Sequence, residues 1–139
     1  MASLSPRLAA SAPRMLSVLR IVAGLIFMAH GTQKLLGFPA GENPQPEFMT
    51  LFWIGGLIEV VAGALIALGL FTRLAAFLAA GEMAVAYWLF HYAADNPFPA
   101  NNGGDAAILY CFVFLYLVFA GPGPWSLDAL RDPARKAYR

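Results

Sequence analysis

Apolar residues in this chain gather into four long runs, separated by segments that are polar or rich in glycine and proline. A helix needs about 20 mainly apolar residues to cross the hydrocarbon core of a bilayer. Three runs reach that length, and the fourth suffices if Asp105 lies at the membrane interface. The pattern predicts helices over about residues 15–36, 50–71, 73–92 and 105–120.

The connecting segments indicate how these helices are arranged. Residues 38–49 form a polar loop with three prolines, and residues 93–105 are rich in Pro, Gly and Asn, which end helices and favour turns. Thr72 and Arg73 make a tight turn between the second and third helices, so those helices are expected to be antiparallel neighbours. We therefore predict a single membrane domain over residues 1–139, an all-α antiparallel bundle of four transmembrane helices.

Composition supports a membrane protein over a soluble one. Hydrophobic residues make up 60% of the chain and charged residues 12%, whereas a soluble domain carries about 25% charged residues. The net charge of +1 gives no electrostatic footprint for nucleic acid, so nucleic-acid binding is not expected.

Basic residues define an orientation. Lys34 alone falls near one side of a four-span arrangement, and the other eight basic residues fall on the opposite side. These eight are Arg7, Arg14, Arg20, Arg73, Arg131, Arg135, Lys136 and Arg139. By the positive-inside rule, both termini face the cytoplasm of a bacterial inner membrane, and the loops at 37–49 and 93–105 face outward.

Both ends of the chain allow a second interpretation. The first run has the arginines and apolar core of a signal peptide, but it is long for one and no A-x-A cleavage site follows it cleanly. We expect it to be retained as a span. Residues 125–139 predict a short amphipathic cytoplasmic tail, with Trp125 at the interface and Ser126 capping a short helix. A disordered segment past Asp132 is the alternative.

Ionisable residues inside the predicted spans are the candidate functional groups, because each costs about 2.5 kcal/mol or more to insert. The four at depth and the two at the outer rim are His30, Lys34, Glu59, Glu82, His91 and Asp105. A helical rise of about 1.5 Å per residue places His30, Glu59 and Glu82 roughly 9, 13 and 15 Å below the outer end of their helices.

Helical spacing directs the deep groups toward a shared interior. His30 and Lys34 are four residues apart and lie on one face. Glu59 falls in a row with Gly55 and Gly63, and small residues mark where membrane helices touch. Glu82 lies in a similar row of alanines on the third helix. We expect Glu59 to pair with Lys34 or His30 in a pocket of the outer half.

Such a pocket has two interpretations. It suits a polar head group such as a quinone carbonyl, or a proton relay through His30, whose unperturbed pKa lies near neutral pH. Alternatively, the polar groups form a network that fixes helix register.

Thiol and metal chemistry have weaker support. Cys111 is the single cysteine and lies in an apolar run, which predicts a packed core residue and no disulfide. His30 and His91 belong to different helices, and neither an H-x-x-x-H nor an E-x-x-H motif occurs. No metal site is therefore predicted, although carboxylate–histidine sites in helical bundles keep one as an alternative.

Several segments together resemble the DoxX family of small four-helix bacterial membrane proteins. They are "GLIFMAHGTQKLLGF", "GGLIEVVAGALIALGLFTRLAA", the histidine ending the third helix, "GGD" and "GPGPWSLD". The resemblance extends from about Arg14 to Leu130. It implies that His30, Lys34, Glu59 and His91 match the family's polar positions. Asp105 stands where members often carry a Glu with an aromatic neighbour, and Glu82 matches no family position.

The resemblance implies a redox-associated role, because the family takes its name from a subunit linked to thiosulfate:quinone oxidoreductase. We expect a membrane subunit of a redox system that binds a quinone-like or other small ligand, next to a redox partner or larger complex. A non-catalytic accessory or assembly subunit is the alternative. A small transporter ranks last, since Arg20 is the one deep polar residue of the inner half. No cofactor motif is present, so whether the chain is catalytic stays open.

Overall fold

The computed structural model describes residues 4–132, and every element named in that range is helical. The elements are α1 (Leu4–Leu36), α2 (Leu51–Leu68), α3 (Thr72–Ala86), the π-helix η1 (Tyr87–His91), α4 (Pro99–Asn102), α5 (Asp105–Ala120) and α6 (Leu127–Arg131). Three stretches are long and apolar enough to cross a membrane: Pro6–Leu36, Leu51–Leu68 and Thr72–His91. These helices confirm the predicted all-helical class and the predicted membrane character of the protein. The apolar helix α5 is shorter, with 16 residues.

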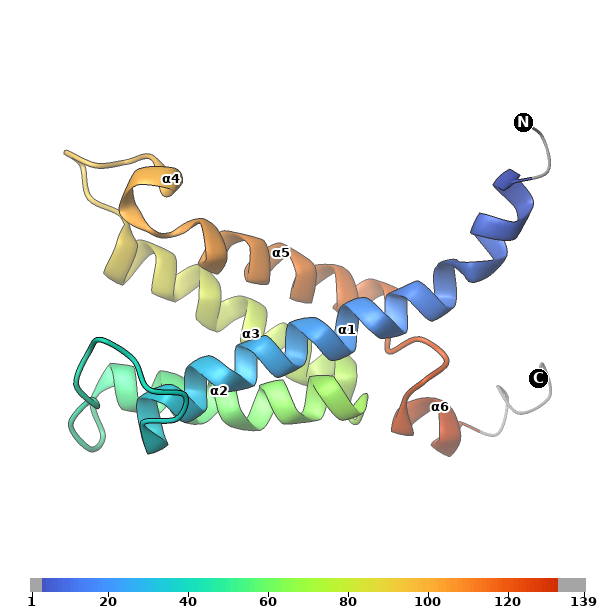
Figure 1. Cartoon of the computed structure of the whole chain (residues 1–139), viewed down its shortest axis with the longest axis horizontal. Helices are drawn as coiled ribbons and strands as arrows, with labels where there is room; N and C mark the ends of the chain where they lie inside the picture. Colours follow the sequence, from blue (N-terminus) through green and yellow to red (C-terminus); the bar gives the residue numbers. More distant parts are fainter. Residues whose placement is uncertain (1–3, 133–139) are drawn as a thin grey trace.

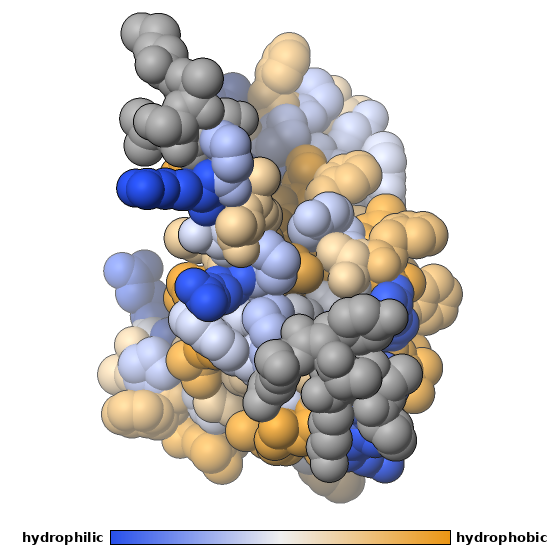
Figure 2. All heavy atoms as spheres, turned by 90° about the vertical axis from the view of Figure 1, so that its right-hand side faces the viewer, coloured by the Kyte–Doolittle hydropathy of each residue, from blue (hydrophilic) through white to orange (hydrophobic). Residues whose placement is uncertain are grey.

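The long helices pack in a chain of contacts, α1 on α2, α2 on α3, and α3 on α5. Figure 1 shows the 37–50 loop and α4 at one end of the molecule, and the α2–α3 turn and α6 at the other. The first part of α1 extends beyond the other helices at the α6 end. Figure 2 looks onto this end, where strongly hydrophilic side chains lie among apolar ones.

α1 and α2 approach each other backbone to backbone at two glycine pairs. A Cβ atom added to Gly63 would lie 2.9 Å from the carbonyl oxygen of Gly24, and one added to Gly31 would lie 2.6 Å from that of Gly56. Both distances are too short for a real Cβ, so these positions accept only glycine without a shift of the helices. Close approach through small residues is a common way for helices to associate in lipid, where water does not drive them together.

The core lies between α1, α2, α3 and α5. Alanines of α3 let α5 come close, and large apolar side chains of α1, α2 and α5 fill the remaining space. The most deeply buried members of this core are Phe27, Ile66, Ala76, Ala79, Phe114 and Leu117. Large apolar side chains also cover much of the outer surface of these helices, as expected for contact with lipid.

Three helix boundaries differ from the sequence-based prediction. α1 begins at Leu4, well before residue 15, because the alanine-rich segment at 8–12 is itself a good helix former, although it lies exposed outside the core. α2 ends at Leu68, before the predicted residue 71, because Gly69 takes a left-handed conformation (φ +70°) and caps it. Thr72, predicted to lie in the turn, is the first residue of α3.

The tail forms the helix that the sequence predicts. The Ser126 hydroxyl accepts a hydrogen bond from the Ala129 N–H at 3.1 Å and caps α6. Its basic residues Arg135, Lys136 and Arg139 lie outside the described residues.

Candidate functional site

A cavity of about 630 Å³ lies between α1, α2, α3, η1 and α5, on the side of the molecule that faces the long loops. Its size is typical of a small-molecule pocket. Five of the six predicted site residues line it: His30, Lys34, Glu59, Glu82 and His91. Aromatic side chains, among them Phe27, Phe52, Phe90 and Tyr110, form much of the remaining wall. The cavity therefore combines an apolar body with a few charged groups.

The central polar contact joins α1 to α2. The Lys34 ammonium donates a hydrogen bond to Glu59 Oε1 at 2.8 Å, which is one of the two pairings that the sequence predicts. The Glu59 side chain is only 4% exposed, whereas that of Lys34 is 29% exposed. Lys34 Nζ also lies 5.8 Å from the centroid of the Phe52 ring, within the range of a cation–π contact. Glu59 is thus held in place from the open side of the cavity.

Glu82 faces the same space from α3. Its Oε1 atom would lie 2.9 Å from a Cβ added to Gly55, so the glycine of α2 makes room for this carboxyl group. Among the described residues, Glu59 Oε2 and Glu82 Oε2 are buried without a hydrogen-bond partner. Buried polar atoms are nearly always paired, so an unpaired one needs an explanation. Two unpaired carboxyl oxygens in one cavity are available to a bound molecule.

The two histidines lie at the margin of the cavity. The His30 ring is exposed and packs edge-on against Tyr110, with 6.1 Å between ring centroids. His91 ends η1, and its Nδ1 atom lies 3.3 Å from the carbonyl oxygen of Asn102. π-Helical turns inside helices are frequent at functional sites. Neither histidine contacts the Lys34–Glu59 pair through a hydrogen bond recorded in the described chain.

Asp105 does not join the cavity. It is exposed at the first residue of α5, where its Oδ1 atom accepts the N–H of Ala106 at 2.9 Å. A carboxylate at a helix N-terminus interacts favourably with the helix dipole. Its position indicates a role in starting α5.

Sequence reasoning missed Tyr110, which lines the cavity from α5. Its ring stacks on Phe114 with 5.5 Å between centroids and meets Phe27 at 5.4 Å. The run 106–120 reads as uniformly apolar, so nothing marks which aromatic side chain turns inward. The spacing of Tyr110 and Phe114, four residues apart on one helix face, is the available signal.

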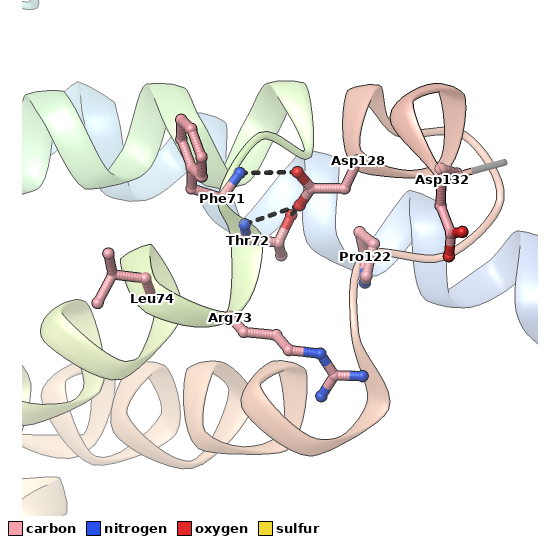
Figure 3. Close-up of a pocket in the computed structure, with 8 residues that line it drawn as sticks. Phe71, Thr72, Arg73, Leu74, Pro122, Asp128 and Asp132 are labelled. Carbon is pink, nitrogen blue, oxygen red and sulfur yellow. Dashed lines mark hydrogen bonds between the residues drawn. The ribbon is translucent and has the colours of Figure 1, made fainter. Parts of the chain in front are cut away.

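A second cavity of about 420 Å³ lies at the opposite end, beside the α2–α3 turn (Figure 3). Asp128 of α6 accepts the backbone N–H groups of Phe71 and Thr72, each at 2.9 Å, and the Thr72 hydroxyl. Arg73 donates to the carbonyl oxygens of Val118 and Phe119 at the end of α5. These side chains cap helix ends, so we assign this cavity a structural role.

Arg20 is the second residue whose role the sequence concealed. It was expected as a basic residue near the edge, but its side chain is fully buried. The guanidinium donates to the carbonyl oxygens of Ile66 and Ala67, both at 2.6 Å, of Pro122 at 2.7 Å, and of Trp125. It thereby joins α1, the end of α2 and the segment before α6.

Metal binding has no structural support in the described part of the chain. Residues 4–132 contain no group of three or more His, Cys, Asp or Glu side chains arranged to hold an ion. Cys111 is a free, half-buried thiol of α5.

Comparison with known proteins gives consistent matches. Residues 15–92 match the family described as DoxX. The chain is 45% identical to an uncharacterized protein of Haemophilus influenzae, over 84% of this chain and 90% of the relative. It is 32% identical to the uncharacterized membrane protein Rv3486 of Mycobacterium tuberculosis (88% and 85% covered) and 33% identical to the inner membrane protein YphA of Escherichia coli (86% and 91% covered). No solved structure matches.

Proposed function

The chain belongs to the DoxX family, and on that premise we propose that it is a membrane subunit of a redox system that binds a quinone-like molecule in the larger cavity. The cavity lies between spanning helices, so a lipophilic molecule reaches it from the bilayer. A redox enzyme that supplies or removes electrons is the expected partner.

The membrane arrangement that we propose has four antiparallel spans in the bacterial inner membrane: α1, α2, α3 with η1, and α5. Both termini then face the cytoplasm. The distribution of basic residues supports this orientation, because the ends near α6 carry Arg7, Arg14, Arg73 and Arg131, whereas Lys34 is the one basic residue of the described range 4–132 that lies toward the other end. The relative named as an inner membrane protein supports the same location.

The observation that carries the ligand proposal is the Lys34–Glu59 ion pair inside an otherwise apolar cavity. Burying an ion pair in hydrocarbon brings little net stability compared with well-packed apolar side chains. Its presence beside open space is therefore better explained by binding than by folding. In this proposal Lys34 and Glu59 orient the polar head of the ligand, and His30 carries protons at the mouth of the cavity.

The test is to purify the protein in mild detergent and identify bound small molecules and proteins by mass spectrometry. The proposal expects a quinone-type molecule in near-equal amount to the protein, and a strong reduction in Glu59→Gln. Asp105→Asn is the matched control, since that carboxylate lies outside the cavity. A folded wild-type protein without any lipophilic ligand would argue against the proposal.

A second candidate is an accessory subunit that packs against a larger membrane complex. The observation favouring it is the exposed aromatic surface of α5, on which Phe112, Tyr116 and Phe119 are 65%, 57% and 76% exposed. A stable protein partner that co-purifies without any ligand, and is retained in Glu59→Gln, would support this candidate over ligand binding.

A further inference from the structure

The helix α1 is longer than a membrane span requires. It has 33 residues, whereas about 20 cross the hydrocarbon core, and residues 17–36 provide that length. Trp125 places the membrane interface near Ser17, because its backbone N–H donates to the Ser17 hydroxyl at 3.1 Å and its side chain is exposed. Residues 6–15, called the N-terminal arm below, therefore lie outside the hydrocarbon core.

The base of the N-terminal arm is fixed to the bundle, and the helix changes direction there. Pro13 lies inside α1, and because proline has no N–H, the carbonyl group of Ala9 loses its helical donor. The Ser17 hydroxyl donates to the Pro13 carbonyl oxygen at 3.4 Å, an arrangement that often bends helices. A Cβ added to Gly123 would lie 3.2 Å from the same oxygen, so the segment before α6 packs against this point. Figure 1 shows the first part of α1 inclined to the rest of the helix.

The arm has an apolar face and a basic face. Every residue of the arm is exposed and none is acidic. Leu8, Ala12 and Met15 have the i, i+4, i+7 spacing of one helix face, and the Leu8 and Met15 side chains are 67% and 64% exposed. Arg7 and Arg14 are seven residues apart and lie together on the adjacent face. A helix of this kind at a membrane interface lies in the plane of the bilayer surface.

We propose that the N-terminal arm binds the anionic surface of the bilayer. Arg7 and Arg14 pair with lipid phosphate groups, and Leu8 and Met15 enter the boundary between headgroups and acyl chains. Charge complementarity selects this occupant, because the cytoplasmic leaflet is negatively charged and the arm carries only positive charges. The guanidinium group forms bidentate hydrogen bonds with phosphate, and its alkyl stem lets it reach the headgroups from a helix that lies deeper. The proposal is independent of the ligand in the larger cavity.

The two arginines set the expected size of the effect. Each basic residue near an anionic membrane surface changes the ratio of bound to free arm about fivefold. Loss of both is therefore expected to lower this ratio about thirtyfold. High salt is expected to weaken binding of the wild-type arm, because it screens the attraction between exposed charges.

The experiment uses full-length protein in nanodiscs of phosphatidylcholine alone or of phosphatidylcholine mixed with phosphatidylglycerol. In a Cys111→Ala background, a nitrobenzoxadiazole dye is attached to Ala12→Cys on the apolar face or to Ala10→Cys on the opposite face. The dye has a long fluorescence lifetime in lipid and a short one in water, so the two amplitudes give the ratio of bound to free arm.

The arginines are tested by substitution in the same labelled proteins. Arg7→Gln/Arg14→Gln removes both charges, and Arg7→Lys/Arg14→Lys keeps them. Arg131→Gln is the control, since Arg131 is an exposed arginine at the same end of the molecule but outside the arm. The arm is exposed, so these changes do not reach the packed core.

The expected result is a long lifetime at Ala12→Cys, but not at Ala10→Cys, in the phosphatidylglycerol nanodiscs. The ratio falls about thirtyfold in the glutamine double variant and is kept in the lysine double variant and in Arg131→Gln. A dye at Ala12→Cys that stays in water would overturn the proposal. Equal ratios in both lipid compositions, unchanged by the glutamine double variant, would overturn the recognition of anionic lipid. A long lifetime that persists in detergent and depends on protein concentration would overturn it in favour of contact with another protein molecule.

Discussion

Burial of the Glu59 carboxyl group costs folding free energy, and the same group lines the larger cavity. Glu59 lies in the middle of a spanning helix and is nearly fully buried, and one of its carboxyl oxygens forms an ion pair with Lys34. A lone charge at such depth is costly, and the pair reduces that cost without removing it. The second oxygen faces the cavity without a partner among the described residues.

This pairing predicts unequal effects for its two members. Lys34→Met leaves a buried carboxyl group unpaired and is expected to destabilise the protein by about 2–3 kcal/mol, less than the cost of about 3–5 kcal/mol for a fully buried pair, because Lys34 is partly exposed. The double variant Lys34→Met/Glu59→Gln is expected to recover most of that loss. Thermal unfolding in detergent, followed by circular dichroism, measures both. A double variant no more stable than Lys34→Met would contradict the ion-pair interpretation.

Asp128 lies at the α6 end of the molecule, and in contrast to Glu59 both of its carboxyl oxygens accept hydrogen bonds. Partial burial acts to raise the pKa of its carboxyl group, but hydrogen bonds from Thr72 and Phe71 and the nearby Arg131 outweigh burial, and the net pKa lies below the ordinary 3.8. A carboxyl group whose pKa is lower in the folded state stabilises the fold above its unfolded pKa. The stabilisation is lost as the pH falls below about 3.8.

Asp128→Asn is therefore expected to lose about 1 kcal/mol of stability at pH 6–7, as for loss of a helix cap. The difference from wild type should shrink as the pH falls below about 3.8, because the unfolded state then binds a proton more readily than the folded state does. Unfolding midpoints measured from pH 7 to pH 3 test this. Exposed Asp95→Asn is the control, and a difference that persists unchanged at pH 3 would exclude the charge as its source.

At the scale of elements, the helix ends near α6 depend on distant side chains. Within the described chain, the residue before α3, Phe71, provides no side-chain cap, and Asp128 supplies one from 57 residues away. Arg20 does the same for the carbonyl groups that end α2. Both charges have the sign that complements the helix dipole, negative at an N-terminus and positive at a C-terminus.

These long-range caps explain what sequence reasoning found and missed. Ser126 was predicted to cap α6 because a local cap is encoded three residues from its partner. Arg20 and Asp128 act across more than 45 residues, and local spacing holds no information about such contacts. The pairing of Lys34 with Glu59 was predictable, because residue numbers along a helix give both the depth of a side chain and the helix face on which it lies. The position of Asp105 outside the cavity depends on how α5 is rotated about its axis.

The glycine contact between α1 and α2 gives a test at this scale. Gly63→Ala places a Cβ within 2.9 Å of the α1 backbone and is expected to destabilise the bundle by about 1–3 kcal/mol through overpacking. Gly81→Ala is the matched control, since a Cβ there has no neighbour within 4 Å in the described chain. It is expected to stabilise α3 by about 0.5–1 kcal/mol. Equal effects of the two substitutions in thermal unfolding would contradict the close helix contact.

At the scale of the whole molecule, the polar groups divide into two sets with separate roles. At the α6 end, Arg20, Arg73 and Asp128 connect helix ends through hydrogen bonds. The opposite end leaves carboxyl oxygens of Glu59 and Glu82 unpaired around a large cavity, as far as the described residues show. Hydrogen bonds join the helix ends at the α6 end, and the carboxyl oxygens at the opposite end are unpaired. This division agrees with a ligand site at one end of a bundle that is held together at the other.

The topology of this frame depends on α5, which has 16 residues and spans about 24 Å as a helix, less than the roughly 30 Å hydrocarbon core. If α5 crosses the membrane, Asp95 before it and Arg131 after it lie on opposite sides.

We expect cysteine at Asp95 and Glu42 to react with a membrane-impermeant maleimide in intact cells, and cysteine at Arg131 to react only after permeabilisation. Cys111→Ala removes the native thiol as background. Labelling of Asp95→Cys and Arg131→Cys on the same side would mean that α5 lies within one leaflet and that the chain spans three times. The cavity wall formed by Tyr110 would then face the interface, and ligand entry would be from water rather than from lipid.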